Sequence, residues 1–527
     1  MSPDGLSYLD MASNALSGGP MKLVNGYWSP AYPALIGTAL FLFRPSPVHE
    51  FPVVQLVNFA IFVLVLSSFT FFLKSWLAVR KPEKPYLIPF SFAVFLWFML
   101  TFITVREVTP DLCVAAVVFC AAGICCRMTM PPSNWKWPIA LGIVLGIGYY
   151  TKAVMLPLGL ILLATLFVVP PSTGLKRLTL VLAGAVLLLM AAPLVALIGN
   201  RVGHLSTGET GRLNYAWYVN GLQSHVGWTG DQNHGLPQHA PRILLDNPRI
   251  LEFANPVGGT YPLWFDPSYW YAGATTRFNL KEQLLALKPN LQVYWQSAAR
   301  MGSLFAGAVA LCIVVLRKRT FPTPDRYSRW LLVWSVAACA MYALVHVEPR
   351  FVGAFLVLFW LALYSVLGQK IASARSRPIL TVVLCALFVP TIASLLIAGA
   401  KTLGVIRSDP PGYLVAANAL RSAGLNPGDR IATAGNTFES YYARCAGLRM
   451  VAEIYDIGAF DRLNEADSQK VKGRLAAIGI KAIVVLDGPD SLTSPGWRDV
   501  PLPDPRRFRF LLLTAPLQTT KLDAHRL

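Results

Sequence analysis

The chain has 527 residues, of which 54% are hydrophobic and only 14% are charged, a balance far from that of soluble proteins. Its length would allow several ordinary domains, but this composition excludes a chain built only of water-soluble ones. The formal net charge is +19. Such an excess can attract nucleic acid, or it can reflect the Lys and Arg that membrane proteins retain in their cytoplasmic connections.

The first 50 residues are mixed in character. Residues 4–12 begin like a helix and carry Asp4 and Asp10, which lie six positions apart. On an external helix two such acids can flank one site and serve general-base catalysis or metal binding. Alternatively, Asp4 favours the helix dipole and Asp10 is solvated. The apolar run 31–43 is too short to cross a bilayer and suits an interfacial helix.

No signal peptide precedes this region, because a positive segment followed by an apolar stretch is missing. The external placement of residues 1–50 therefore predicts either a first membrane span upstream of Met1 or translocation of the short tail unaided.

Apolar runs of about the length that a bilayer requires recur along residues 51–400. We predict spans over 51–73, 87–104, 109–126, 138–151, 153–170, 177–198, 298–316, 330–347, 351–368 and 378–399.

The cations fall on one side of these spans. With the N-terminus outside, the inner connections carry sixteen: Lys74, Arg80, Lys81, Lys84, Arg127, Lys136, Lys176, Arg177, Arg317, Lys318, Arg319, Arg326, Arg329, Lys370, Arg375 and Arg377. The short outer connections carry only Arg106, Lys152 and Arg350. The charge excess is thus explained by topology, and we predict no nucleic-acid partner.

Charged side chains gather at three outer turns. The first contains Arg106, Glu107 and Asp111, the second Lys152, and the third His346, Glu348 and Arg350. Ionisable groups at a membrane surface tend to be paired or functional. Arg350 can bind a phosphate bidentately, with Glu348 orienting it. The alternatives are an Arg106–Asp111 pair, a snorkelling Lys152 and a helix-connecting turn with an internal ion pair.

Residues 199–296 are predicted to form a large external loop. Its segment 258–271 places six aromatic rings among turn residues, which suits the bilayer interface or the wall of a sugar site. The candidates for binding acceptor or sugar are Tyr261, Trp264, Asp266, Tyr269 and Trp270. The loop histidines His204, His225, His234 and His239 match no strong metal-binding spacing.

Residues 402–527 alternate short β-rich and helical runs, with strands over 430–434, 449–455 and 482–486 and helices near 437–446 and 463–478. This pattern predicts a small extramembrane α/β domain for substrate capture or support. Seven of the eight cysteines lie in or beside predicted spans and only Cys445 is in this region, so no external disulfide framework is implied.

The motifs resemble, in chain order through residues 1–400, the GT-C superfamily of membrane glycosyltransferases, particularly relatives of the protein O-mannosyltransferases and lipid A aminoarabinose transferases. Residues 4–12 resemble the family's Asp-Glu-x-x-Tyr-x-x-x-Ala motif, with Gly5 in place of the second acid. Residues 25–33 resemble its juxtamembrane region. Thr109-Pro110-Asp111, Gly148 to Lys152 and Glu348-Pro349-Arg350-Phe351 resemble later family elements.

This resemblance implies that Asp4 is the general base for the acceptor and that Asp10 supports it or binds a metal. Arg106, Lys152 and Arg350 would bind the donor phosphate, with Tyr8, Glu107, Asp111, His346 and Glu348 in supporting positions. A first span upstream of residue 1 is also implied. No cofactor is certain, and the departure at Gly5 leaves the use of a divalent metal open.

The sequence therefore predicts a polytopic α-helical membrane protein of GT-C type in three parts. These are an external acidic-motif region over 1–50, a transmembrane domain over 51–400 and an external α/β domain over 402–527. The expected activity is transfer of a hexose or pentose from a polyprenyl-phosphate donor to a glycan, lipid or protein acceptor. It is expected to be inverting and to occur on the non-cytoplasmic side of the plasma (inner) membrane.

Two other functions remain open. A transporter or flippase of a lipid-linked or anionic solute would also place cations near the membrane surface, but it predicts inverted repeats and broken helices, and the sequence shows neither. A non-catalytic glycan-binding or assembly protein would tolerate loss of Asp4, Asp10 and Asp111.

Overall fold

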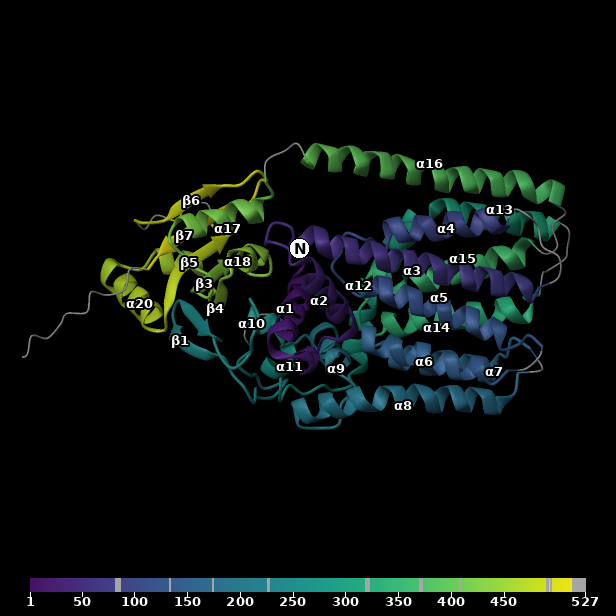
Figure 1. Ribbon diagram of the computed structural model, residues 1–527, viewed down its shortest axis with the longest axis horizontal. Helices are drawn as coiled ribbons and strands as arrows, with labels where there is room; N and C mark the ends of the chain where they lie inside the picture. The colour runs from purple at the N-terminus through teal and green to yellow at the C-terminus, as the bar shows by residue number, and fades with distance from the viewer. Residues whose placement is uncertain are drawn as a thin grey trace, which may run out of the picture.

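The computed structural model describes residues 1–80, 87–131, 134–172, 175–224, 228–317, 323–368, 373–406, 410–489, 492 and 495–513. Long helices run side by side along the main axis of the molecule, an α/β unit lies at one end of them, and the N-terminal helices lie at the junction (Figure 1).

The N-terminal segment forms α1 (Pro3–Gly18), the short 3-10 helix η1 (Pro20–Leu23) and α2 (Ala31–Phe43). Ser2 caps α1, because its Oγ accepts a hydrogen bond of 3.2 Å from the amide of Gly5. A Cβ at Gly5 would lie 2.8 Å from Cβ of Val108. Gly5 therefore lets α1 pack closely against the turn before Asp111.

Every predicted span contains a helix. The bundle is built from α3 (Glu50–Ala78), α4 (Leu87–Thr101), α5 (Asp111–Arg127), α6 (Lys136–Thr151), α7 (Met155–Val168), α8 (Arg177–Val202), α13 (Gly302–Arg317), α14 (Arg326–Ala343), α15 (Pro349–Gly368) and α16 (Ser373–Ile406). Close packing between them depends on small residues. A Cβ at Gly142 would lie 2.6 Å from the carbonyl oxygen of Ala183, so this glycine allows α6 and α8 to touch.

Among the described residues, α3, α8 and α15 are individually long and apolar enough to cross a membrane. A fourth span results if α12 (Leu280–Arg300) and α13 count together, although they bend by 76°. The sequence did not indicate this broken helix. Exposed Leu284, Leu291 and Trp295 lie on α12, and such an amphipathic helix suits a bilayer interface, from which α13 turns into the bundle.

The large loop contains α9 (Thr210–Tyr218), α10 (Pro262–Phe265), α11 (Pro267–Trp270) and the hairpin of β1 (Arg242–Asp246) and β2 (Arg249–Glu252). The helical turns α10 and α11 come from the aromatic segment 258–271. α10 packs against α1, and α11 follows α10 directly (Figure 1). The hairpin leaves the loop and joins the α/β unit.

The α/β unit holds a mixed seven-stranded sheet in the order β1-β2-β4-β3-β5-β7-β6. Its other elements are α17 (Gly412–Ser422), β3 (Arg430–Gly435), α18 (Tyr441–Ala446), β4 (Arg449–Ile454), α19 (Ile457–Asp461), α20 (Glu465–Ala477), β5 (Ile480–Leu486), β6 (Arg498–Pro501) and β7 (Arg507–Leu512). β3 pairs in parallel with β4 and β5, as expected for strands joined by helices. The predicted strands are confirmed, whereas β6, β7 and the hairpin from the loop were not foreseen.

A buried ion cluster holds the α/β unit against α1. The guanidinium of Arg444 on α18 lies 2.6 Å from Asp10 and 2.5 Å from Glu50, and it also donates to Ser13. Asp10 accepts two further hydrogen bonds, from the amide and the hydroxyl of Thr260. Asp10 is therefore buried and fully paired, in contrast to the solvated alternative for this residue.

We expect Arg444→Ala to destabilise the protein strongly, because the buried carboxylate of Asp10 and the partly buried carboxylate of Glu50 would lose their cation. Breaking a buried pair in this way costs about 3–5 kcal/mol, which thermal unfolding in detergent would detect as a lower Tm. Arg462→Ala is the matched control, since Arg462 is exposed on the same unit. Equal Tm changes in the two variants would contradict a structural role for the cluster.

A second buried acid, Glu453 on β4, joins the sheet to the aromatic segment. Its carboxylate accepts hydrogen bonds from the hydroxyls of Tyr261 (2.9 Å) and Thr437 (3.2 Å). Burial nevertheless raises the pKa of Glu453 to about 7 from its ordinary value of 4.5.

This pKa predicts a pH-dependent stability. The folded chain keeps the Glu453 proton to a higher pH than the unfolded chain does, so this stabilisation is complete below the ordinary pKa and is lost as pH rises through about 7. The loss is about 3 kcal/mol. Glu453→Gln should therefore flatten the fall in Tm between about pH 5 and pH 8. An unchanged fall would show that another group causes it.

Candidate functional site

A cavity of about 410 Å³ lies where α1, the bundle and the aromatic segment meet. It is lined by charged side chains of the three predicted outer turns and by aromatic rings of the N-terminal and loop segments. These residues include Asp4, Tyr8, Tyr27, Trp28, Asp111, Lys152, Tyr218, Trp264, Tyr342, His346, Glu348, Arg350 and Phe351. The structure thus brings together most of the site residues predicted from the sequence.

Arg350 is the centre of the charges in this first cavity. It lies in the first turn of α15, and its guanidinium is 2.6 Å from Glu348, 3.5 Å from both Asp4 and Asp111 and 3.6 Å from Glu107. Its side chain is only 15% exposed. Four carboxylates from three parts of the chain therefore hold one guanidinium at the cavity wall.

Lys152 contributes the second cation. It ends α6 in an extended conformation, and its ammonium lies 2.7 Å from Oδ1 of Asp111 and 3.7 Å from the centre of the Phe351 ring. The other oxygen of Asp111 is buried and forms no hydrogen bond among the described residues, but it lies 3.5 Å from Nε of Arg350 as an ion pair. Asp111 pairs with Lys152 and Arg350, so the predicted alternative of an Arg106–Asp111 pair is not observed.

Asp4 faces the same cavity from the first turn of α1. Its Oδ1 accepts a hydrogen bond of 3.2 Å from the indole of Trp264, and its Oδ2 lies 3.5 Å from Arg350. Burial raises the pKa of Asp4 above its ordinary value, although Arg350 and Trp264 act in the opposite direction. A carboxylate whose pKa is raised is a stronger base than an ordinary one, which suits it to take a proton from an acceptor.

The turn before α15 is fixed by ring stacking and hydrogen bonds. The His346 ring stacks on Tyr218 at 3.8 Å, and its Nε2 lies 3.4 Å from Glu348. Burial alone would raise the pKa of Glu348, but bonds with His346 and Arg350 outweigh it and lower the pKa to about 2. Glu348 therefore stays ionised and fixes the orientation of Arg350.

Several predicted site residues lie elsewhere. Arg106 is exposed and does not line the cavity. Glu107 does not line it either, but its side chain, which is 50% exposed, lies 3.6 Å from the guanidinium of Arg350. Asp10 belongs to the buried ion cluster. Tyr261 and Trp270 are buried in the interior, where Trp270 donates to the carbonyl of Pro262.

The aromatic wall of the first cavity was only partly foreseen. Trp28 meets Trp264 edge to face at 6.1 Å. Trp217 does not line the cavity but supports this wall by stacking on Trp264 at 5.7 Å. Tyr27 meets Trp28 at 4.5 Å. The adjacent aromatic residues Tyr27 and Trp28 were the available sign of this part of the wall in the sequence. Their partners, Trp217 and Trp264, lie about 190 and 236 residues further along the chain.

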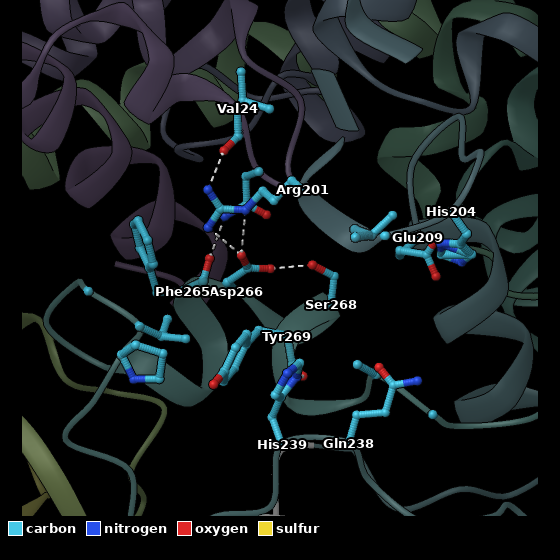
Figure 2. Close-up of a pocket in the computed structure, with 18 of the residues that line it drawn as sticks. Val24, Arg201, His204, Glu209, Gln238, His239, Phe265, Asp266, Ser268 and Tyr269 are labelled. Carbon is cyan, nitrogen blue, oxygen red and sulfur yellow. Dashed lines mark hydrogen bonds and ion pairs between the residues drawn. The ribbon is translucent and has the colours of Figure 1, made fainter. Parts of the chain in front are cut away.

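A second and larger cavity, of about 950 Å³, receives Asp266 and Tyr269 (Figure 2). Nε and Nη2 of Arg201 at the end of α8 donate to the same carboxylate oxygen of Asp266, over 3.2 and 2.7 Å. His239 stacks on Tyr269 at 4.0 Å. His204 also lines this cavity.

The two cavities share a thin partition built from residues 24–28, 208–211 and 264–266. The side-chain amide of Asn25 donates to the carbonyl of Phe265 over 2.9 Å, and the amide of Glu209 donates to Gly26 over 2.7 Å. Neighbouring residues of each segment line opposite cavities, as Trp264 and Phe265 do. The cavities are therefore about one backbone apart.

No three His, Cys, Asp or Glu side chains are grouped as metal ligands in the described part of the chain. Of the loop histidines, His234 is bonded to Asp231, and His225 lies outside the described residues. The carboxylates of the first cavity point at Arg350 instead. The chemistry proposed below therefore uses the side chains alone.

The fold is similar to that of a known membrane glycosyltransferase. The crystal structure of ArnT from Cupriavidus metallidurans in the apo state matches over 98% of this chain and 94% of its own, with a TM-score of 0.54 and 12% sequence identity. The structure of the same protein bound to undecaprenyl phosphate matches with a TM-score of 0.52 and 13% identity.

The chain has the GT-C fold. The resemblance that the motifs indicated is thereby confirmed at the level of the fold. A more distant GT-C structure, the Archaeoglobus fulgidus oligosaccharyltransferase in complex with Zn and sulfate, matches 92% of this chain and 64% of its own, with a TM-score of 0.50 and 14% identity. No protein-family model and no curated protein sequence matches the chain.

Proposed function

We propose that this chain is a membrane glycosyltransferase that moves a sugar from a polyprenyl-phosphate donor to an acceptor hydroxyl or amine. The observation that carries the proposal is the first cavity, in which Asp4, Lys152 and Arg350 converge from three distant parts of the chain. A protein with the same fold binds undecaprenyl phosphate, which supports a lipid-linked donor.

The donor phosphate would bind to Arg350 and Lys152. Arg350 presents a planar fork that matches phosphate oxygens, but four carboxylates already surround it. An entering phosphate has to displace one of them. Glu107 is the most exposed of the four and has the longest contact, 3.6 Å, so its pair with Arg350 is the easiest to exchange.

Asp4 would act as the general base. Its carboxylate takes the proton of the acceptor hydroxyl, the acceptor oxygen bonds to the anomeric carbon, and the bond from that carbon to the phosphate oxygen breaks. The electron pair of that bond leaves with the polyprenyl phosphate, and Arg350 and Lys152 stabilise the charge that develops there. One such displacement inverts the anomeric configuration.

The remaining charged residues would act by positioning. Glu348, which is itself 3.4 Å from His346, holds the guanidinium of Arg350, and Asp111 holds the ammonium of Lys152. Tyr8 packs edge to face on Trp28 at 5.2 Å and lines the first cavity, so it helps to shape the cavity wall.

The cavity is proposed to open on the non-cytoplasmic side of the plasma (inner) membrane. The end of α3 that leads to Arg80 and the end of α5 at Arg127 lie at the other end of the bundle (Figure 1), where the positive-inside rule places the cytoplasm.

A reconstitution experiment tests this function. Oriented proteoliposomes would receive a polyprenyl-phosphate sugar in one leaflet only, and the release of polyprenyl phosphate would be followed by mass spectrometry. We expect release only from the leaflet on the side of the α/β unit. Movement of intact donor to the other leaflet, without release, would instead identify a transporter.

A further inference from the structure

The second cavity has the features of a binding site rather than of a packing defect. Its volume of about 950 Å³ is near the upper end of the range of about 300–1,000 Å³ that is usual for ligand sites. Charged side chains line it, although none of them takes part in the proposed chemistry of the first cavity.

Two arginines are held in fixed positions along this cavity. Arg201 is tied to the carboxylate of Asp266, which is 1% exposed, and to the carbonyl of Val24, while its own side chain remains 41% exposed (Figure 2). Arg212 is held in the same way by Glu209 at 2.5 Å and by the carbonyl of Ala274. Each guanidinium has five N–H donors, so further donors remain for a ligand.

The charge balance favours a neutral polar ligand over a strong anion. Each of these arginines is matched by a buried carboxylate, Asp266 or Glu209, so the two pairs add little net charge. Among the described residues, the one further cation in the lining is Lys22, which is exposed, and a single exposed charge is screened by solvent. They do present planar, pre-oriented donors and acceptors, which is what a ligand rich in hydroxyl groups requires.

An aromatic platform adds the second element of such a site. The rings of His239 and Tyr269 stack with an interplanar angle of 8° and both line the cavity (Figure 2). Flat aromatic faces pack well against the C–H faces of sugar rings, while their polar tips can accept or donate hydrogen bonds. Planar polar side chains beside an aromatic platform together point to a carbohydrate.

We propose that the second cavity binds the carbohydrate part of the acceptor substrate. This inference rests on the proposed transferase function in naming the ligand as the acceptor. The thin partition supports it, because it places the two cavities close together. A glycan held beside Tyr269 would lie about one backbone away from Trp264, whose indole donates a hydrogen bond to the proposed base Asp4. The same sugar chemistry could come from a free oligosaccharide or from the headgroup of a glycolipid.

The test is binding of purified full-length protein in detergent to an array of neutral and anionic oligosaccharides, followed by competition with glycolipids that carry the bound sugars. We expect at least one neutral oligosaccharide to bind, and Tyr269→Ala to weaken that binding about tenfold or more. Stronger competition by the glycolipid would identify a lipid-linked acceptor, and equal competition a free glycan; either result supports the inference.

Two further variants make the result decisive. Ser17→Trp fills the cavity from an exposed position at the end of α1 and should also abolish binding, without removing any of the contacts described above. Phe278→Ala is the control, because Phe278 is an exposed aromatic residue of the same loop that lines neither cavity. Binding that survives both Tyr269→Ala and Ser17→Trp, or binding only of anionic sugars, would overturn the inference.

The failure of this inference and the failure of the proposed function can be told apart. If the protein releases polyprenyl phosphate but binds no carbohydrate, the inference about the second cavity is wrong and the proposed transferase function is unaffected. If the protein binds carbohydrate in the second cavity but releases no polyprenyl phosphate, the second cavity is a glycan-binding site and the proposed transferase function is wrong.

Discussion

Replacing Asp4 with asparagine is expected to lower the rate of sugar transfer by about 10²–10⁴-fold, the usual contribution of a general base. The amide keeps the shape of the side chain and can still accept the hydrogen bond from Trp264, but it cannot take up a proton. The rate of acceptor glycosylation under saturating donor is the measurement. Asp246→Asn, an exposed acid on β1, is the matched control.

The pH dependence of transfer gives an independent test of the same residue. Burial raises the pKa of Asp4, and a base works only when it is deprotonated. Activity should therefore fall with decreasing pH, and the midpoint should lie above the ordinary value of 3.8. If Asp4→Asn kept both the rate and this acidic limb, Asp4 would not be the base.

Replacing Arg350 with lysine is expected to lower kcat by about 10²–10³-fold, as loss of a pre-oriented donor to a developing anion does. Lysine keeps the positive charge near Asp111 and Glu348, so the fold should survive, but a single ammonium cannot reproduce the bidentate fork. The KM for the donor should also rise, because the same fork would bind the ground-state phosphate.

Two controls accompany this variant. Arg300→Gln removes an exposed arginine at the end of α12 and should leave kcat unchanged. Arg106→Gln is the more informative comparison, because Arg106 was predicted to bind phosphate but is exposed outside the first cavity. We expect a much smaller effect at Arg106 than at Arg350, and the reverse order would refute the assignment of the donor site.

The sequence predicted those features whose causes are local. Bilayer-length apolar runs predicted the helices, because backbone polar groups in a membrane have to bond within their own segment. The charged turns at Asp111, Lys152 and Arg350 were found because polar groups at the ends of apolar helices stand out. The sequence indicated that these turns could meet in one cavity only because all of them were predicted on the same side of the membrane.

Features that depend on distant partners could not be predicted. Asp10 and Arg444 are 434 residues apart, and either one alone resembles an ordinary surface charge. The hairpin at 242–252 gains its sheet partner only at β4, and the pair His239 and Tyr269 shows no spacing signal. Asp10 and Asp266 were predicted as site residues, but the cations that bind them, Arg444 and Arg201, come from other parts of the chain.

The measurement that tests the central claim most directly is the release of polyprenyl phosphate from a panel of polyprenyl-phosphate sugars by purified wild-type protein and by Asp4→Asn, with both shown to be folded by their melting curves. Release from at least one donor by the wild type, and its loss in Asp4→Asn, is the predicted result. No release from any donor by the folded wild type, or equal release by both proteins, would contradict a transferase with Asp4 as its base.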